Sequence, residues 1–192
     1  ELMKAVDVII ATGGMGMVKS AYSSGKPAYG VGVGNVQGII DRNIDIQDAV
    51  TKIIASRTFD NGIICSGDQS MIVHEEDYDQ VIATLKANGA YYIEGGEERD
   101  RLRSALFTEG AMNKNLVGQP VSKVAEVAGI NLPQGTKMIA VKAEGAGKID
   151  LLSKEKMCPV ISTYRYKSFT EAVDIVEKER DKLIGELKNK ET

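Results

Sequence analysis

A cysteine set in a turn is the residue of this chain best suited to covalent chemistry. Cys65 follows an Asn61-Gly62 turn and a two-residue apolar step, and an apolar run that starts at Met71 comes soon after it. A thiol beside a turn can be reached by a substrate and activated as a thiolate nucleophile. A free cysteine is more often a small buried apolar residue, so the residues alone also leave a structural role for Cys65 open.

Two clusters of glycines suggest places where a ligand or another backbone comes close. The segment 12–16, Thr-Gly-Gly-Met-Gly, follows an apolar run and opens a predicted helix, where exposed amides and the helix dipole favour an anion such as a pyrophosphate. Its spacing is not G-x-G-x-x-G, and a tight turn that needs glycine for a positive φ is an equal alternative. The segment 30–35 alternates glycine with valine, which is typical of a strand that is approached closely by a ligand or by backbone.

Two further side chains are weaker candidates for a site. His74 is the only histidine and stands before an acidic stretch, so we expect a solvated helix start there and not a metal site. Nothing in the pattern brings His74 back to Cys65. Glu155 precedes a strand led by Pro159 and could accept a hydrogen bond from a ribose hydroxyl, although a surface acid is the simpler interpretation.

The elements that must position these residues alternate between strand and helix, which predicts an α/β fold with parallel strand pairs. Strands are predicted at residues 6–11, 28–33, 39–40, 70–74, 90–93, 138–142 and 159–166. Helices are predicted at residues 15–24, from an N-cap at Asp45, at 76–88, 97–107 and 121–128, and from about residue 171 after a cap at Ser168. Residues 177–192 alternate acidic with basic side chains and predict a solvated helical tail.

The composition excludes several classes of protein. The net charge is -3 and no apolar run approaches the ~20 residues that span a bilayer, so we expect neither a nucleic-acid partner nor a membrane partner. The two cysteines, Cys65 and Cys158, do not make a disulfide framework and suggest a reducing compartment, by default the cytoplasm. The first residue is Glu1 and not Met, from which we expect a piece of a longer protein or a processed product.

Several of these segments together resemble the aldehyde dehydrogenase superfamily. The resemblance is carried by residues 11–14, 17–19, 21–28 and 32–35, and by the Thr-Phe-Asp-Asn-Gly run at 58–62 that leads to Cys65. Within the superfamily the chain is most similar to the CoA-acylating branch, which includes acetaldehyde and propionaldehyde dehydrogenases and the aldehyde half of bifunctional aldehyde–alcohol dehydrogenases. The resemblance extends from about residue 6 to about residue 176.

The resemblance implies a role for each candidate residue. Cys65 matches the catalytic thiol, which would have to stand at an open pocket. The residues implied to lie at the NAD cofactor are Thr12, Gly13, Gly14, Val31 and Glu155, the last of which matches the acid that holds the nicotinamide ribose in the family's E-x-F-G-P motif. Met157 and Cys158 replace the Phe and Gly of that motif, which weakens the expected packing of the nicotinamide ring but leaves the carboxylate.

One departure from the superfamily concerns the acceptor of the acyl group. Hydrolytic members carry a Glu in an E-L-G-G motif as the general base for water, and the aligned residue here is Gly30. The resemblance therefore implies that Cys65 adds to an aldehyde, that hydride passes to NAD to leave a thioester, and that coenzyme A takes the acyl group. A CoA thiol, which ionises near pH ~8.5, attacks a thioester without such a base.

The resemblance also implies a domain organisation. Residues 1–35 match the end of a nucleotide-binding domain, residues 36–176 the thiol-bearing catalytic domain, and residues 177–192 depart from the family. We expect a homo-oligomer located in the cytoplasm or in a bacterial microcompartment, acting on a short-chain aldehyde and CoA. We expect the isolated chain to be inactive as a dehydrogenase. A non-catalytic folded fragment or assembly piece is the main alternative, and a nucleotide-binding module is a weaker one.

Overall fold

The computed structural model describes residues 1–32 and 34–188 of the chain. The chain divides into two compact units, one made of Glu1–Gly34 with the C-terminal residues from Lys182 onward, and one made of Asn35–Asp181. Each unit has its own strands and its own apolar core.

The first unit is a strand–helix–strand motif. Strand β1 (Ile9–Thr12), helix α1 (Met15–Tyr22) and strand β2 (Ala28–Val31) follow one another, and the two strands pair in parallel as predicted. Strand β1 begins three residues later than predicted. The Ile9 amide bonds to the carbonyl of Pro27 at 2.9 Å, and Pro27 has no N–H to continue the ladder upstream.

The second unit contains a five-stranded parallel sheet with the order β3-β4-β9-β8-β5. Its strands are β3 (Val36–Ile40), β4 (Asp68–His74), β5 (Ala90–Ile93), β8 (Met138–Lys142) and β9 (Val160–Tyr166). Strands β4 and β9 are neighbours, with Ser70 opposite Ser162. The segments that lead into β4 and β9 therefore meet at the same edge of the sheet, the amino edge.

Helices cover both faces of this sheet. They are α2 (Ile46–Thr58), α3 (Tyr78–Ala87), α4 (Gly96–Leu106), α5 (Val121–Ala128) and α6 (Phe169–Lys188). The predicted caps are present: the Asp45 carboxylate accepts a hydrogen bond from the Asp48 amide at 3.0 Å, and the Ser168 hydroxyl accepts one from the Glu171 amide at 3.3 Å.

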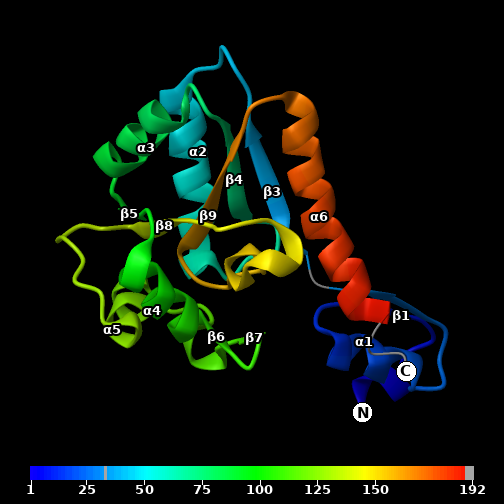
Figure 1. Cartoon of the computed structure of the whole chain (residues 1–192). Helices are drawn as coiled ribbons and strands as arrows, with labels where there is room; N and C mark the ends of the chain where they lie inside the picture. Colours follow the sequence, from blue (N-terminus) through cyan, green and yellow to red (C-terminus); the bar gives the residue numbers. More distant parts are fainter. Residues whose placement is uncertain (33, 189–192) are drawn as a thin grey trace. The chain divides into compact units, whose positions relative to one another are not determined.

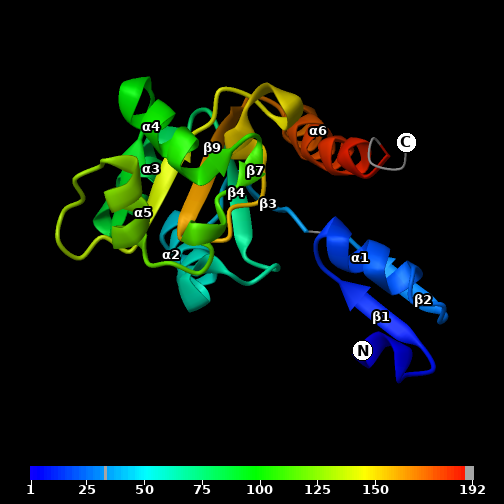
Figure 2. The same cartoon turned by 90° about the horizontal axis from the view of Figure 1, so that it is seen from below.

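The core follows from the alternation of side chains along each strand. Met71 and Val73 of β4 pack into the apolar cluster built with α2 and α3, whereas Ile72 between them belongs to the cluster built with α4, α5 and α6. Figures 1 and 2 show α2 and α6 on opposite sides of the sheet. This three-layer arrangement confirms the predicted α/β fold.

Some elements have no counterpart among the predictions. A hairpin joins β6 (Phe107–Thr108) to β7 (Ala111–Met112) through Glu109 and Gly110, which have φ values of 51° and 77°. Positive φ at both central residues is the geometry of a tight hairpin turn. Among the described residues, no helix combines the length and the apolar character that crossing a membrane would require.

Candidate active site

Cys65 lies in an exposed turn between helix α2 and strand β4. A short 3-10 segment, Phe59–Gly62, leads to it, and Asp60, Asn61 and Gly62 in this segment all have positive φ values of 47°, 52° and 71°. Three successive left-handed residues reverse the chain sharply after α2. The Asn61 side-chain amide holds the reversal by donating a hydrogen bond to the carbonyl of Gly118 at 3.0 Å. The backbone amide of Cys65 has no acceptor within the described part of the chain.

A buried arginine lies underneath this turn. Arg57, in the last turn of α2, is 0% exposed. Its guanidinium donates hydrogen bonds only to backbone carbonyls: to Gly62 (2.5 Å), Asp68 (3.1 Å), Lys156 (2.5 Å) and, through two nitrogens, Cys158 (2.8 and 3.1 Å). One side chain thus ties both ends of the thiol turn to the segment that leads into β9.

Gly62 makes this arrangement possible. A Cβ at Gly62 would stand 2.7 Å from the carbonyl oxygen of Cys158 and closer still to the Arg57 guanidinium. Together with its positive φ, this leaves room for no other residue type without displacement of the arginine. The Asn-Gly pair recognised in the sequence is therefore required by both backbone conformation and packing.

Glu155 begins the segment on the other side of Arg57 and is half-buried. Burial raises the pKa of its carboxyl group, and the positive charge of Arg57 partly opposes this. No hydrogen bond to the Glu155 carboxylate is found in the described part of the chain. The next residue is fastened to β4, because the Lys156 amide donates to the side-chain oxygen of buried Gln69 at 2.8 Å. Cys65 and Glu155 therefore both lie on segments that lead into neighbouring strands at the amino edge.

The other thiol and the single histidine are placed away from this chemistry. Cys158 is fully buried, and burial raises its pKa to about 12, so it remains a protonated thiol at neutral pH. His74 ends β4, at the opposite end of the strand from Cys65, and its ring contacts the carbonyl of Lys167 at 3.1 Å. No cluster of three or more metal-ligating His, Cys, Asp or Glu side chains occurs in the residues that the structure describes.

The glycine turn of the first unit brings together four of the residues singled out from the sequence. Thr12 is paired with Val31, and the Gly13 amide donates to the Val31 carbonyl at 3.0 Å. Gly14 caps the start of α1, and a Cβ at Gly14 or at Gly16 would meet no atom within 4 Å. A side chain would therefore find room at either glycine, and the anion site expected at this helix start stays a prediction.

Gly30 supports the close packing of α1 on β2. A Cβ at Gly30 would lie 2.6 Å from Cγ1 of Val18 and 2.9 Å from the ring of Tyr22. The Tyr22 hydroxyl also accepts a hydrogen bond from the Gly30 amide at 3.0 Å. A glutamate at this position would displace both α1 side chains.

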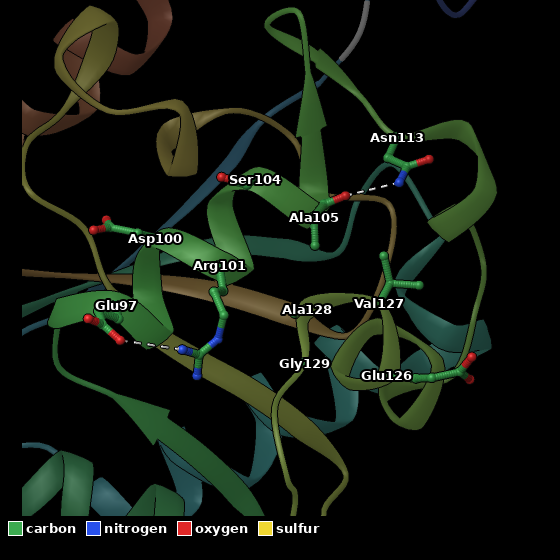
Figure 3. A pocket seen from close by; sticks show the side chains of 10 residues that line it. All are labelled: Glu97, Asp100, Arg101, Ser104, Ala105, Asn113, Glu126, Val127, Ala128 and Gly129. Carbon is green, nitrogen blue, oxygen red and sulfur yellow. Dashed lines mark hydrogen bonds and ion pairs between the residues drawn. The ribbon is translucent and has the colours of Figure 1, made fainter.

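A sizeable cavity lined by described residues lies elsewhere. It measures about 850 Å³ and is bordered by α4, α5 and the residue Asn113, whose side chain bonds to the Ala105 carbonyl at 3.0 Å (Figure 3). Glu97 and Arg101 on α4 form a 3.9 Å ion pair at its rim. Cys65 lines neither this cavity nor the three smaller ones defined by described residues. The pocket expected beside Cys65 stays a prediction.

The fold and the thiol turn correspond to a known family. Residues 3–185 match the aldehyde dehydrogenase family, and the chain belongs to that family. Over 175 residues it is 53% identical to the succinate-semialdehyde dehydrogenase (acetylating) of Clostridium kluyveri, covering 91% of this chain and 39% of that protein.

Solved structures agree with this assignment. The acetylating aldehyde dehydrogenase of Geobacillus thermoglucosidasius has a TM-score of 0.88 at 42% identity, over 94% of this chain and 40% of that one. A propionaldehyde dehydrogenase of Rhodopseudomonas palustris, solved with bound CoA and an acylated cysteine, has a TM-score of 0.83 at 28% identity, over 94% of this chain and 42% of that one.

The comparisons confirm the resemblance drawn from the sequence, including its CoA-acylating branch. The chain spans about two fifths of the length of these relatives (39% to 42%). The family match also continues beyond residue 176, where the resemblance was expected to end, and reaches residue 185 within helix α6.

Arg57 is the residue of this site that sequence reasoning missed. A basic residue in the last turn of a helix is usually explained by the helix dipole and by solvent exposure. The local signal that could have drawn notice is Gly62 five residues later, because a glycine after two turn-forming residues permits close approach. The carbonyl groups from Lys156 and Cys158 have no such local signal, since they lie about a hundred residues away in sequence (99 and 101).

Proposed function

We propose that the chain is the thiol-bearing portion of a CoA-acylating, NAD-dependent aldehyde dehydrogenase. The observation that carries the proposal is the contrast between the two thiols. Cys65 is exposed in a turn with an unengaged backbone amide, whereas Cys158 is fully buried and protonated. The branch of the family to which the relatives belong, in which one structure holds an acylated cysteine, supports Cys65 as the acyl carrier.

In the proposed mechanism the Cys65 thiolate adds to the aldehyde carbonyl and forms a thiohemiacetal. The Cys65 backbone amide is placed to donate a hydrogen bond to the developing oxyanion. NAD, when bound, supplies the hydride acceptor that turns the thiohemiacetal into a thioester. The thiolate of CoA then attacks the thioester carbonyl, and the Cys65 thiolate leaves as the acyl group passes to CoA.

Each unit, taken by itself, offers groups that suit one part of a dinucleotide. At the start of α1, Gly14 and Gly16 leave backbone open for a phosphate group, and the helix dipole favours an anion there. Glu155 offers a half-buried carboxylate whose hydrogen-bonding capacity is unused in the described part of the chain, as a ribose hydroxyl would require. Thr12, Gly13 and Val31 shape the turn between these glycines and β2.

Gly30 favours a thiol over water as the acyl acceptor. The room that a general-base glutamate would occupy is taken by Val18 and Tyr22. Water without a base is a poor nucleophile, whereas the CoA thiol ionises near pH ~8.5 and attacks thioesters as the thiolate. We therefore expect slow hydrolysis of a thioester on Cys65.

Acyl transfer to the chain from acetyl-CoA tests the proposal. Intact-mass measurement is expected to show one acetyl group on the wild-type chain and on the control variant Cys158→Ala, and none on Cys65→Ser. An equal yield on Cys65→Ser, or no acetylation of the wild type at any acetyl-CoA concentration, would contradict the proposal.

Separately, we expect little NAD reduction by the isolated chain with acetaldehyde and CoA. Turnover within about tenfold of a full-length relative would refute this second expectation.

A folded assembly piece without catalysis is the second candidate, and the exposed apolar face of the first unit favours it. Ile10 is 80% exposed and its cross-strand partner Tyr29 is 69% exposed. Apolar side chains gathered on one sheet face indicate an interaction surface, in agreement with the homo-oligomer expected from the sequence. We propose that the protein is located in the cytoplasm or in a bacterial microcompartment. This location rests on the family resemblance and on the two cysteines, which make no disulfide framework.

A further inference from the structure

Arg57 is a fully buried charged side chain at the thiol site, and its contacts are unusual for a buried cation. No carboxylate lies within ion-pair distance of it in the described part of the chain. All five of its hydrogen bonds go to backbone carbonyls. Burying a guanidinium is costly unless its donors are satisfied, and burial indeed lowers the Arg57 pKa, opposed by the negative charges of Glu155 and Asp68.

The carbonyls that Arg57 holds are not distributed at random. Two of them, from Gly62 and Asp68, bracket Cys65 at a distance of three residues on each side. The other two, from Lys156 and Cys158, belong to the segment that begins with Glu155. The arginine therefore joins the two segments on which the proposed nucleophile and the proposed ribose ligand stand.

We propose that Arg57 is a positioning residue that fixes the Cys65 turn against the Glu155 segment. Its contribution to catalysis rests on the function proposed above, whereas the coupling of the two segments does not. Arg57 is 0% exposed, so it acts through the backbone of the turn and does not touch substrate. Catalysis by an oriented nucleophile depends on such fixed geometry, because small displacements of the reacting atoms slow the reaction strongly.

Lysine cannot replace arginine in this role. The guanidinium donates from Nη1 to Asp68, from Nε to Cys158, and from Nη2 to Gly62, Lys156 and Cys158, whereas an ammonium group is a single point of attachment that cannot replace the Nη1 and Nε bonds as well. Arg57→Lys keeps the charge and removes the bridge, and it is therefore the more informative substitution. Arg57→Met removes both.

Hydrogen exchange followed by mass spectrometry measures the coupling directly. In Arg57→Lys and Arg57→Met, amides in residues 59–68 and 154–158 should exchange faster together, by about tenfold or more, as expected for loss of hydrogen bonds to a charged group. The control is Leu102→Ala, in the buried face of α4, which should lower the melting temperature without a selective effect on these two segments. If Arg57→Met does not fold, Arg57→Lys alone decides the question.

Two results would overturn the positioning role. One is unchanged exchange in either segment of the folded Arg57 variant, and the other is the same selective pattern in Leu102→Ala. The rate of Cys65 acetylation by acetyl-CoA is measured in parallel. This rate should fall in Arg57→Lys. It should not fall in Leu102→Ala when the two variants have the same melting temperature. Absence of acetylation in the wild type would contradict the proposed function, and the exchange data would still decide whether Arg57 couples the two segments.

Discussion

Replacement of Gly62 by alanine tests the packing of the thiol turn with a single methyl group. The residue has a φ of +71°, and a Cβ there would stand 2.7 Å from the Cys158 carbonyl oxygen and in collision with the Arg57 guanidinium. The left-handed backbone costs a non-glycine residue about 1–2 kcal/mol. Displacing Arg57 from at least one carbonyl adds about 1.5–3 kcal/mol, the usual value for a hydrogen bond to a charged group.

A matched control separates these two effects. Gly129, after helix α5, has a φ of +65°, and a Cβ there would meet no atom within 4 Å. Gly129→Ala should therefore lose only the backbone contribution of about 1–2 kcal/mol, and Gly62→Ala about 2.5–5 kcal/mol. For a chain of this length these losses correspond to about 2–8 °C and about 5–20 °C in melting temperature.

Urea unfolding followed by circular dichroism measures both losses in the same buffer. The expected result is a lower transition midpoint for Gly62→Ala than for Gly129→Ala, with equal denaturant dependence. Cys65 should also be alkylated at an altered rate in folded Gly62→Ala and at the wild-type rate in folded Gly129→Ala. Equal midpoints for the two variants would refute the close approach of Arg57 to Gly62.

Three further predictions concern thiol reactivity, pH and self-association. Iodoacetamide near neutral pH should label one thiol of the native chain, Cys65, because burial raises the pKa of Cys158 to about 12; two labels per native chain would contradict this. Burial raises the Glu155 pKa above 4.5, so the stability gained from its proton is complete below pH 4.5 and is lost as the pH rises through the raised pKa. The free energy of unfolding of Glu155→Gln, measured in urea, should therefore rise relative to that of the wild type between pH 4.5 and neutral pH. A difference between the two proteins that does not change with pH would exclude the effect. The double variant Ile10→Lys, Tyr29→Lys should self-associate less than the wild type in light scattering. A wild-type chain that is already monomeric would count against self-association through the exposed sheet face.

The parts of the fold that sequence predicts well are those with strong local signals. Strand β5, helix α5 and strand β8 begin and end where predicted, because apolar periodicity and flanking turn residues define them. The two-residue strands β6 and β7 are too short to show any periodicity, and they were missed. Strand β1 was predicted too long because its apolar run continues upstream of the residues that find a partner in β2.

The candidate site divides in the same way between local and distant information. The turn that exposes Cys65 follows from Asn61 and Gly62, which lie four and three residues before it in sequence. The bridge through Arg57 depends on carbonyls that come from the start of β9, 99 and 101 residues away. Backbone carbonyls are present at every residue, so no sequence pattern marks the ones that a buried arginine will bind. Such a residue is found only once the sheet order places β4 beside β9.

The division of the chain into two units separates the two halves of the proposed chemistry. Cys65, Arg57 and Glu155 belong to the second unit, and the glycine turn of Gly13 and Gly14 belongs to the first. In the proposed mechanism, acyl exchange between Cys65 and a thioester requires the thiol turn and no hydride acceptor, whereas aldehyde oxidation also requires bound NAD. Acetylation at Cys65 without NAD reduction is therefore the behaviour that the proposed function predicts for this chain. In such a chain, an Arg57→Lys substitution that slowed acetylation would do so through the geometry of the thiol turn and of the Glu155 segment, and not through hydride transfer.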